Sequence, residues 1–447
     1  MKKFQAAYVP IGVGTFDMAS ADAAFADSVQ MLQDICKDIA VPEKKLLTIA
    51  DLQAYLDTVD PDLIILQNLT FANAAYASEV VHCFKDVPLL LWTLREPAID
   101  GTRLRLNSLT GAFSAGNAIR QLTGRPFAYV YGSPNEESVT HTIKAVLAAA
   151  RIRHDMRSLT IASIGHTPEG FGFGRALDLD LLETFGVHQT AVEARELMAK
   201  AKQYREEDLQ EYLQDAGKRT VGLDQLPPKN VMDFVRLYRA YEEYVKVNHI
   251  GALASRCWPD FFTAYSTPVC AVLAMLNDLG VAAACEADTY GALSMWVGMQ
   301  LSHQPVFFGD PVSLNEQENT ITFWHCGTAA CSLARVDTGA VIGKHCNRHI
   351  GPTMEFGTKP SAHATIFRIG RNPDGTFRFL IAKGKALDKP KQFYGTSCVI
   401  QTEDHAAKII SQSVKDGWEP HFVVIYDDMA DQLEALSDML QIPVTVY

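Results

Sequence analysis

The stretch CEADTYGALSMWVGMQLSHQPVFFGDP, residues 285–311, places two acidic residues at the ends of short apolar segments. Residues 281–285 predict a strand that ends before Glu286, and residues 305–310 predict a second strand that ends on Asp310. The segment between them predicts a helix with four residues available for burial, Leu293, Trp296, Val297 and Met299. A strand, a helix and a second strand in this order predict two parallel strands of an α/β fold.

The two acids are expected to lie side by side, because the carboxyl ends of parallel strands meet at the same edge of a sheet. Ligands of open α/β sheets bind at this edge. Carboxylates that share one spot repel each other unless a cation or a shared proton relieves them. Oxygen donors favour a hard ion such as Mn²⁺ or Mg²⁺ over Zn²⁺. The alternative for either acid alone is a helix N-cap, and Asp310 before Pro311 fits that alternative too.

Composition describes a globular enzyme and excludes several partners. The chain has 447 residues, of which 48% are hydrophobic and 21% charged, so two or three domains are expected. A net charge of −12 argues against nucleic acid and anionic membranes as partners. No apolar run approaches the roughly 20 residues that span a bilayer, and the first residues predict a strand rather than a signal peptide.

Nine cysteines without a CxxC pair indicate buried thiols in a reducing cytoplasm. The spacing of Cys326 and Cys331 beside His325 matches no common zinc finger. We therefore expect a cytoplasmic protein without a zinc finger.

The order of elements predicts an α/β fold with two doubly wound parallel domains and a mostly antiparallel β C-terminal domain. Residues 1–155 alternate strand and helix, with strands that include KKLLTI at 44–49 and a loop, WTLREP, that carries Trp92 and Arg95. Residues 156–312 form the central domain with the two carboxylates. Residues 313–447 alternate as antiparallel strands and end as strand, helix and strand.

Two loops of the central domain follow predicted strands. The glycine-rich loop GHTPEGFGFG, residues 165–174, lacks the lysine of a P-loop, so flexibility is the preferred interpretation over anion binding. Arg256, Trp258 and Asp260 follow the strand at 250–255, which gives a third strand end near the acids. Arginine beside an aromatic ring suits a hydroxylated or anionic substrate.

Five motifs together resemble the L-fucose/L-arabinose isomerase superfamily, in its shorter L-fucose isomerase-like branch. They are SRCWPDF at 255–261, CEAD at 285–288, FFGD at 307–310, HCG at 325–327 and PHFVV at 420–424. The resemblance implies that Glu286, Asp310 and His421 bind Mn²⁺, or another divalent cation such as Mg²⁺ or Co²⁺. It also implies that Glu286 and Asp310 are catalytic, with Arg256, Trp258 and His325 at the substrate.

The implied activity is that of an aldose–ketose isomerase, an intramolecular oxidoreductase that moves a proton between C1 and C2 of an open-chain sugar through a cis-enediol. The family further implies a homo-oligomer (hexamer, trimer or dimer) with shared active sites, in which Trp92 and Arg95 cover the substrate of a neighbouring subunit. No nucleic acid or membrane partner is expected.

The substrate is left open among several sugars. Members of this branch interconvert 6-deoxy-6-sulfoglucose and 6-deoxy-6-sulfofructose, and an anionic C6 group would suit five basic residues, Arg256, Lys344, His345, Arg348 and Lys359. Solvated loop charges are the alternative explanation for these residues. A plain deoxyhexose or pentose (L-fucose or D-arabinose type) is the next candidate substrate. A non-catalytic sugar-binding protein, a metal-dependent aldolase and a glycosidase are the competing functions.

Overall fold

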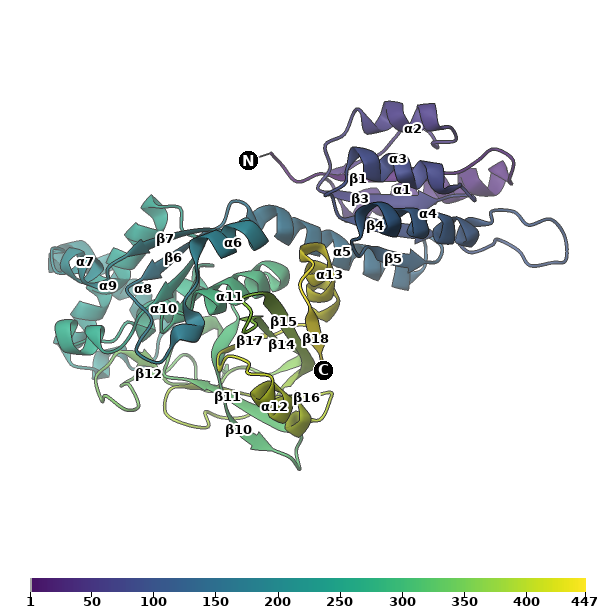
Figure 1. Cartoon of the computed structure of the whole chain (residues 1–447). Coiled ribbons are helices and arrows are strands. Elements are labelled where there is room, and N and C mark those ends of the chain that lie inside the picture. Colours follow the sequence, from purple (N-terminus) through teal and green to yellow (C-terminus); the bar gives the residue numbers. More distant parts are fainter. Residues whose placement is uncertain (1) are drawn as a thin grey trace. The chain divides into compact units, whose positions relative to one another are not determined.

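The computed structural model describes residues 2–447, and the chain divides into two compact units. The smaller unit comprises Met1–Asp155 and Asp431–Ile442, and the larger comprises Met156–Ala430 and Pro443–Tyr447. Figure 1 labels the elements of both. Among the described residues, no helix combines the length and apolar character needed to cross a membrane.

The smaller unit contains a five-stranded parallel sheet in the order β2-β1-β3-β4-β5. Its strands are β1 (Ala6–Ile11), β2 (Ile39–Ala40), β3 (Leu63–Asn68), β4 (Leu89–Thr93) and β5 (Ala128–Tyr131). Its helices are α1 (Met18–Ile35), α2 (Ile49–Leu56), α3 (Ala74–Cys83), α4 (Ser108–Thr123) and α5 (Glu137–Met156), with α13 (Ala430–Leu440) added from the C-terminal part.

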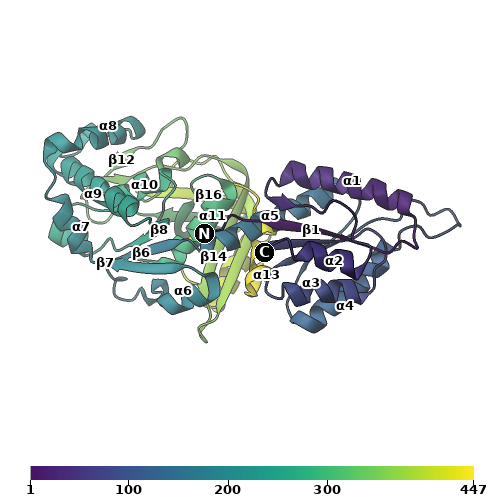
Figure 2. The same cartoon turned by 90° about the horizontal axis from the view of Figure 1, so that it is seen from above.

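Helices cover both faces of this sheet because its strands alternate between two apolar cores. Tyr8 and Ile65 face the core that α1 and α5 complete, whereas Val9 and Ile64 face the core that α2, α3 and α4 complete. Figure 2 shows α1 on one side of β1 and α2 and α3 on the other. The predicted doubly wound arrangement of this part is confirmed.

The predicted strand at residues 44–49 is wrong. The chain there makes only one isolated bridge, between Ile11 and Leu46. The neighbouring strand β2 pairs only with Ala6 and Ala7 of β1, and the segment KKLLTI adds just this one bridge near the other end of β1.

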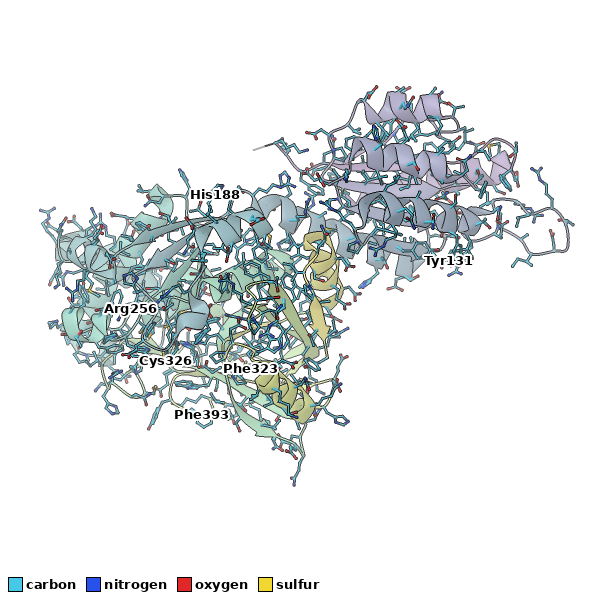
Figure 3. All side chains as sticks on the ribbon, in the orientation of Figure 1. Tyr131, His188, Arg256, Phe323, Cys326 and Phe393 are labelled. Atoms are coloured by element: carbon cyan, nitrogen blue, oxygen red, sulfur yellow. The ribbon has the colours of Figure 1, made fainter. Side chains whose placement is uncertain are left out.

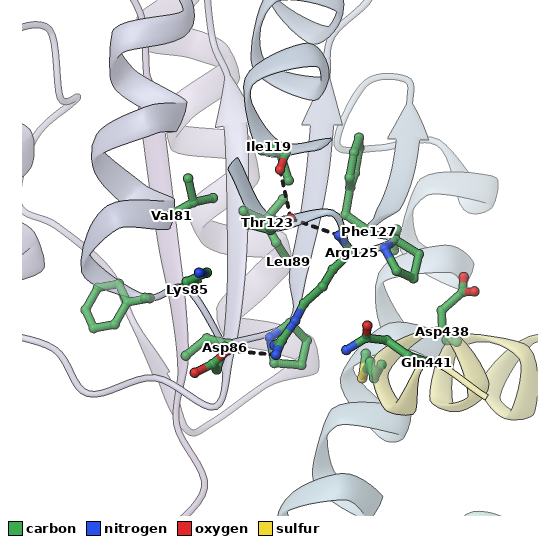
Figure 4. Close-up of a pocket in the computed structure, with 17 residues that line it drawn as sticks. Val81, Lys85, Asp86, Leu89, Ile119, Thr123, Arg125, Phe127, Asp438 and Gln441 are labelled. Carbon is green, nitrogen blue, oxygen red and sulfur yellow. Dashed lines mark hydrogen bonds and ion pairs between the residues drawn. The ribbon is translucent and has the colours of Figure 1, made fainter. Parts of the chain in front are cut away.

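A small cavity of ≈ 50 Å³ lies in the smaller unit, where the segment before β4, the end of α4 and α13 meet (Figure 4). Arg125 forms an ion pair with Asp86 at 2.7 Å, and its backbone N–H donates to the Thr123 hydroxyl at 3.1 Å. No residue predicted for the active site lines this cavity.

The larger unit begins with a four-stranded parallel sheet in the order β7-β6-β8-β9. Its strands are β6 (Thr160–Ile164), β7 (His188–Val192), β8 (Ala252–Ser255) and β9 (Ala282–Cys285). The helices that accompany it are α6 (Asp178–Phe185), α7 (Ala194–Ala201), α8 (Gln210–Arg219), α9 (Pro228–Val247), α10 (Cys270–Asp278) and α11 (Thr289–Ser302).

A closed barrel of mostly antiparallel strands completes the larger unit. The strand order is β14-β17-β10-β11-β16-β15-β18, and an additional pairing of β14 with β15 closes the ring. The strands are β10 (Phe307–Asn315), β11 (Thr320–His325), β14 (Ser361–Arg371), β15 (Phe377–Ala386), β16 (Thr396–Thr402), β17 (Phe422–Ile425) and β18 (Val444–Val446). A small ribbon of β12 (Ile342–Gly343) and β13 (Thr353–Met354) and the helix α12 (Ala406–Lys415) lie outside the ring.

Helix α11 lies between the parallel sheet and the barrel. It packs against β8 and β9 on one side and against β14 and β17 on the other. All four residues predicted for burial, Leu293, Trp296, Val297 and Met299, are buried. A helix that is apolar all round belongs in an interior, and its two neighbours explain why the sequence carries no polar face here.

The predicted parallel pairing of the strands on either side of α11 is wrong. β10 does not join β9 but pairs antiparallel with β11 and β17. Asp310 therefore lies within β10, next to a register irregularity between Pro311 and Ser313, rather than at a strand end before a helix. The N-cap alternative for Asp310 is excluded for the same reason.

Candidate active site

Glu286 follows β9 on a strained turn. The φ angle is 58° at Glu286 and 54° at Ala287, in the left-handed region that residues other than glycine rarely adopt. Such residues cost about 1–3 kcal/mol each and persist where their surroundings hold them. Here the Ala287 N–H donates to the Ser255 carbonyl at 3.1 Å, and Asp288 caps α11 by accepting from the Gly291 N–H at 2.8 Å.

Asp310 and His421 are neighbours across the barrel strands. Gly309 of β10 pairs with Phe422 of the antiparallel strand β17. Asp310, which follows Gly309, therefore lies opposite His421, which precedes Phe422. His421 Nε2 lies 3.5 Å from Asp310 Oδ1 and 3.0 Å from Glu286 Oε2. The structure thus brings together the three residues that the sequence analysis proposed as metal ligands, two from the barrel and one from the parallel sheet.

The other nitrogen of His421 is held by a buried ion pair. Nδ1 lies 2.9 Å from Asp288 Oδ2, and Arg368 of β14 donates to Asp288 through Nη1 at 2.7 Å and Nη2 at 3.1 Å. The side chains of Arg368 and Asp288 are 0% exposed. A carboxylate that accepts from Nδ1 fixes the imidazole ring and directs Nε2 toward Glu286 and Asp310.

The surroundings shift the pKa values of Glu286 and Asp310 in opposite directions. Burial opposes ionisation of Glu286, but the His421 hydrogen bond and the positive charges of His325 and His421 together outweigh it and lower the pKa of Glu286. Burial raises the pKa of Asp310, and the Glu286 charge adds to this. Burial likewise opposes the charge of His421, yet its bonds to Asp288 and Glu286 raise its pKa to about 9. One carboxylate is thus held ionised while the other keeps a proton more readily.

Aromatic side chains surround His421. The ring centroids of Phe308 and Phe173 lie 4.7 Å and 5.4 Å from that of His421. Phe171 contacts Trp258 at 5.7 Å, and the Trp258 Nε1–H donates to Glu286 Oε1 at 2.9 Å. These rings exclude water from one side of the acids and strengthen the electrostatic interactions there.

His325 completes a donor set of oxygen and nitrogen atoms. It is buried at the end of β11, and its ligand atom lies within 4.8 Å of those of Glu286 and His421. Burial opposes a charge on His325, but the neighbouring Cys326 raises its pKa to about 10. Carboxylates and imidazoles are donors that Mn²⁺, Mg²⁺ and Co²⁺ accept, so the residues fit such an ion.

Comparisons with known proteins show which family the chain belongs to. No family model matches the chain. It is 60% identical over 447 residues to a sulfoquinovose isomerase of Clostridium sp. (strain MSTE9), covering 100% of both chains. It is also 34% identical to the sulfoquinovose isomerases of Priestia aryabhattai (444 residues) and Alkalicoccus urumqiensis (440 residues), with 98% of each chain covered.

The chain belongs to the sulfoquinovose isomerase family. Membership of this family makes it an enzyme, an isomerase, as the sequence analysis predicted. Among solved structures, GanP, a glucose-galactose binding protein from Geobacillus stearothermophilus, matches with a TM-score of 0.17 and 12% identity over 68% of this chain and 94% of that one. A likeness at that level gives no support to the sugar-binding alternative.

The remaining residues predicted to contact substrate in this family member lie in different surroundings. Arg256, labelled in Figure 3, pairs with Asp260 at 2.6 Å and is only partly exposed beside Trp258. Trp92 is buried within β4, where its Nε1–H donates to the Gly132 carbonyl at 2.9 Å, so it does not lie in an exposed loop. Arg95 is half exposed and pairs with Glu136 at 2.8 Å in the same unit.

Four residues of the site were missed by the sequence analysis. Asp288 and Arg368 hold His421, and Phe171 and Phe173 pack on it. The loop of the two phenylalanines can approach because Gly174 has no side chain, since a Cβ there would lie 2.8 Å from the Asp288 Cα. The signals in the sequence were an aspartate two residues after Glu286 and a pair of aromatic residues in a glycine-rich loop.

Proposed function

We propose that this protein is a sulfoquinovose isomerase, which converts 6-deoxy-6-sulfoglucose (sulfoquinovose) into 6-deoxy-6-sulfofructose. One observation carries the proposal: the side chains of Glu286, Asp310 and His421 converge at one place in a chain that belongs to this family. The proposal includes a place in the L-fucose/L-arabinose isomerase superfamily, a cytoplasmic location and a homo-oligomeric state.

The two carboxylates suit the proton transfers of aldose–ketose isomerisation. The reaction removes the proton on C2, adds one to C1 and transfers a proton between the oxygens, without net oxidation. Glu286, whose pKa His421 lowers and which accepts a hydrogen bond from Trp258, is the group ready to accept a proton from carbon. Asp310, whose pKa is raised by burial, is the group ready to supply one. Because the two interact, they titrate as a pair.

Glu286, Asp310 and His421 are also the residues that would hold Mn²⁺ or a similar divalent cation. Such an ion would supply Lewis-acid stabilisation of the negative charge that develops on the sugar oxygens. His421 is suited to this role because Asp288 accepts from its Nδ1 and leaves Nε2 facing the carboxylates.

Arg256 is the strongest of the five basic residues proposed for the C6 sulfonate. It follows β8 two residues before Trp258, which binds Glu286, and its partner Asp260 engages only one side of the guanidinium. His345 is buried, whereas Lys344 and Arg348 are exposed. Arginine offers the paired donors that the planar or trigonal oxygens of an anion accept.

The function is tested by incubating the Mn²⁺-loaded protein with a panel of aldoses in D₂O and following each by NMR. The panel contains sulfoquinovose, 6-deoxyhexoses, glucose and pentoses. We expect conversion of sulfoquinovose to the sulfoketose, with solvent deuterium entering at the carbon that receives the proton. Preferred conversion of a plain 6-deoxyhexose or pentose would replace the proposed substrate, and binding without conversion of any sugar would overturn the proposal.

Replacing Arg256 with alanine is expected to weaken binding of the sulfonated sugar selectively. Loss of a hydrogen bond to a charged group corresponds to a rise in KM of roughly 10- to 100-fold for sulfoquinovose. KM for an uncharged aldose that the enzyme accepts should stay unchanged. Arg205→Ala, at an exposed arginine that pairs with Glu207 and Asp208, is the matched control. An unchanged KM for sulfoquinovose in Arg256→Ala would remove Arg256 from the anion site.

A further inference from the structure

Four thiols of the larger unit meet at one place, where three are buried and that of Cys326 is partly exposed. Cys257 follows β8, Cys270 begins α10, Cys285 ends β9, and Cys326, labelled in Figure 3, follows β11. The Sγ of Cys270 lies 3.4 Å from that of Cys257 and 3.8 Å from that of Cys326. The Sγ of Cys285 lies within 4.8 Å of those of Cys257 and Cys270 and also of that of Cys326. All four are free thiols.

These separations suit sulfurs around a metal ion better than a disulfide. With a Zn–S bond of about 2.3 Å, the sulfurs of a tetrahedral site lie about 3.8 Å apart. A disulfide would need about 2.05 Å between two of them. Two of the Sγ–Sγ distances, 3.4 Å and 3.8 Å, lie close to that value.

Two imidazoles flank the thiols. His345 lies with its ligand atom within 4.8 Å of Cys270 and Cys326, and His325 lies likewise near Cys285 and Cys326. Cys270 is the first residue of the nine-residue helix α10, where the N-terminal end of a helix favours a thiolate. Nitrogen donors and positive charge are thus available to a thiolate site, as in Cys₃His and Cys₄ zinc sites.

We propose that Cys257, Cys270, Cys285 and Cys326 form a second metal site, which binds one soft divalent cation of the Zn²⁺ type. Ligand softness separates it from the site of Glu286, Asp310 and His421, because thiolates select Zn²⁺ and carboxylates select harder ions. The nearby His345 is the nitrogen donor that can take the place of one thiolate.

The role of this site is to fix the strand ends that carry the active-site side chains. Cys257 precedes Trp258, Cys285 precedes Glu286, and Cys326 follows His325. One ion bound by these thiolates ties the ends of β8, β9 and β11 together, and its binding free energy adds to the stability of the folded chain.

The test measures metal content rather than activity. The full-length protein is purified without chelator, loaded with excess Zn²⁺ and desalted, and its zinc is measured by mass spectrometry. We expect the wild type to hold about one zinc per chain more than Cys270→Ala, the content of a single closed structural site. Cys270→Ala should lose this zinc, and Cys398→Ala, the same change at a buried thiol of β16 outside the cluster, should keep it. Co²⁺ loading of the wild type should give a thiolate-to-cobalt charge-transfer band that Cys270→Ala lacks.

Three results that do not involve cobalt would overturn the second site. They are wild-type protein without zinc after loading, equal zinc loss in Cys398→Ala, and a disulfide among the four cysteines in protein purified without oxidant. Should Cys270→Ala fail to fold, the cobalt spectrum of the wild type decides the question alone. A weak cobalt spectrum without the thiolate band would place the ion at oxygen and nitrogen donors and contradict the site. None of these readouts depends on isomerase activity, so they are independent of the proposed function.

Discussion

Replacing Glu286 with glutamine is expected to lower the turnover of the isomerase by roughly 10²-fold or more, the scale of a lost acid–base group. Glutamine keeps the size of the side chain and an oxygen that can accept from Trp258 Nε1, so the pocket should keep its shape. It loses the negative charge and the ability to take a proton. Asp310→Asn should show a loss of similar size, because it removes the second member of the coupled pair.

Steady-state kinetics on purified variants measure this effect. The matched control is Glu316→Gln, the same chemical change at an exposed glutamate that follows β10, and it should leave the rate unchanged. Since the two carboxylates act as a unit, the double variant should be hardly slower than either single variant. Rates near those of the wild type in both single variants would place the chemistry elsewhere in the molecule.

Stripping the protein of divalent ions with a chelator is expected to abolish isomerisation, and Mn²⁺ is expected to restore it. Lewis-acid stabilisation of charge on the sugar oxygens amounts to several kcal/mol, so its removal should slow the reaction by roughly 10²-fold or more. Mg²⁺ and Co²⁺ should be compared with Mn²⁺ in the same assay. Metal content must be measured beside the rate, because a chelator also reaches the thiolate site.

His421→Gln serves as the matched variant for this prediction. It should lose Mn²⁺ from the carboxylate site while keeping zinc at the cysteines, since His421 is not among the groups near those thiols. Full activity in protein shown to hold no metal would exclude a metal role in catalysis. Loss of both metals together in His421→Gln would show instead that this substitution disrupts the fold.

The sequence was sufficient to predict the local elements around Glu286 but not the partner strand of Asp310. The apolar segment between the two acids predicted α11 and its four buried residues correctly, because a helix buried all round has an unmistakable composition. PVFFGD predicted a strand, yet a short apolar strand has the same pattern in parallel and antiparallel sheets. One of its partners, β17, lies more than a hundred residues further along the chain, so local pattern gave no information about that pairing, whereas the other partner, β11, follows directly and pairs with Asp310 itself.

The site residues also divide into those that the sequence could predict and those that it could not. Glu286 and Asp310 could be predicted as site residues because each acid adjoins a short apolar strand. His421 was predicted from the resemblance of PHFVV to a family motif rather than from spacing. Asp288 serves as the N-cap of α11 and also holds His421, and only the first of these roles has a sequence pattern. Arg368 is a fully buried arginine in β14, and a charged residue in an alternating strand predicts exposure. Its burial depends on Asp288, which only the folded chain brings to it.

The position of α11 between sheet and barrel has a consequence for how this enzyme can be altered. Glu286 is anchored to the sheet, whereas Asp310 and His421 are anchored to the barrel, so the reactive groups come from two substructures that only their docking aligns. A change far from the sugar, such as a bulkier residue where α11 passes β17, would shift the barrel relative to the parallel sheet. Asp310 and His421 would then move relative to Glu286. Engineering of this enzyme should therefore treat the interface along α11 as part of what determines its specificity.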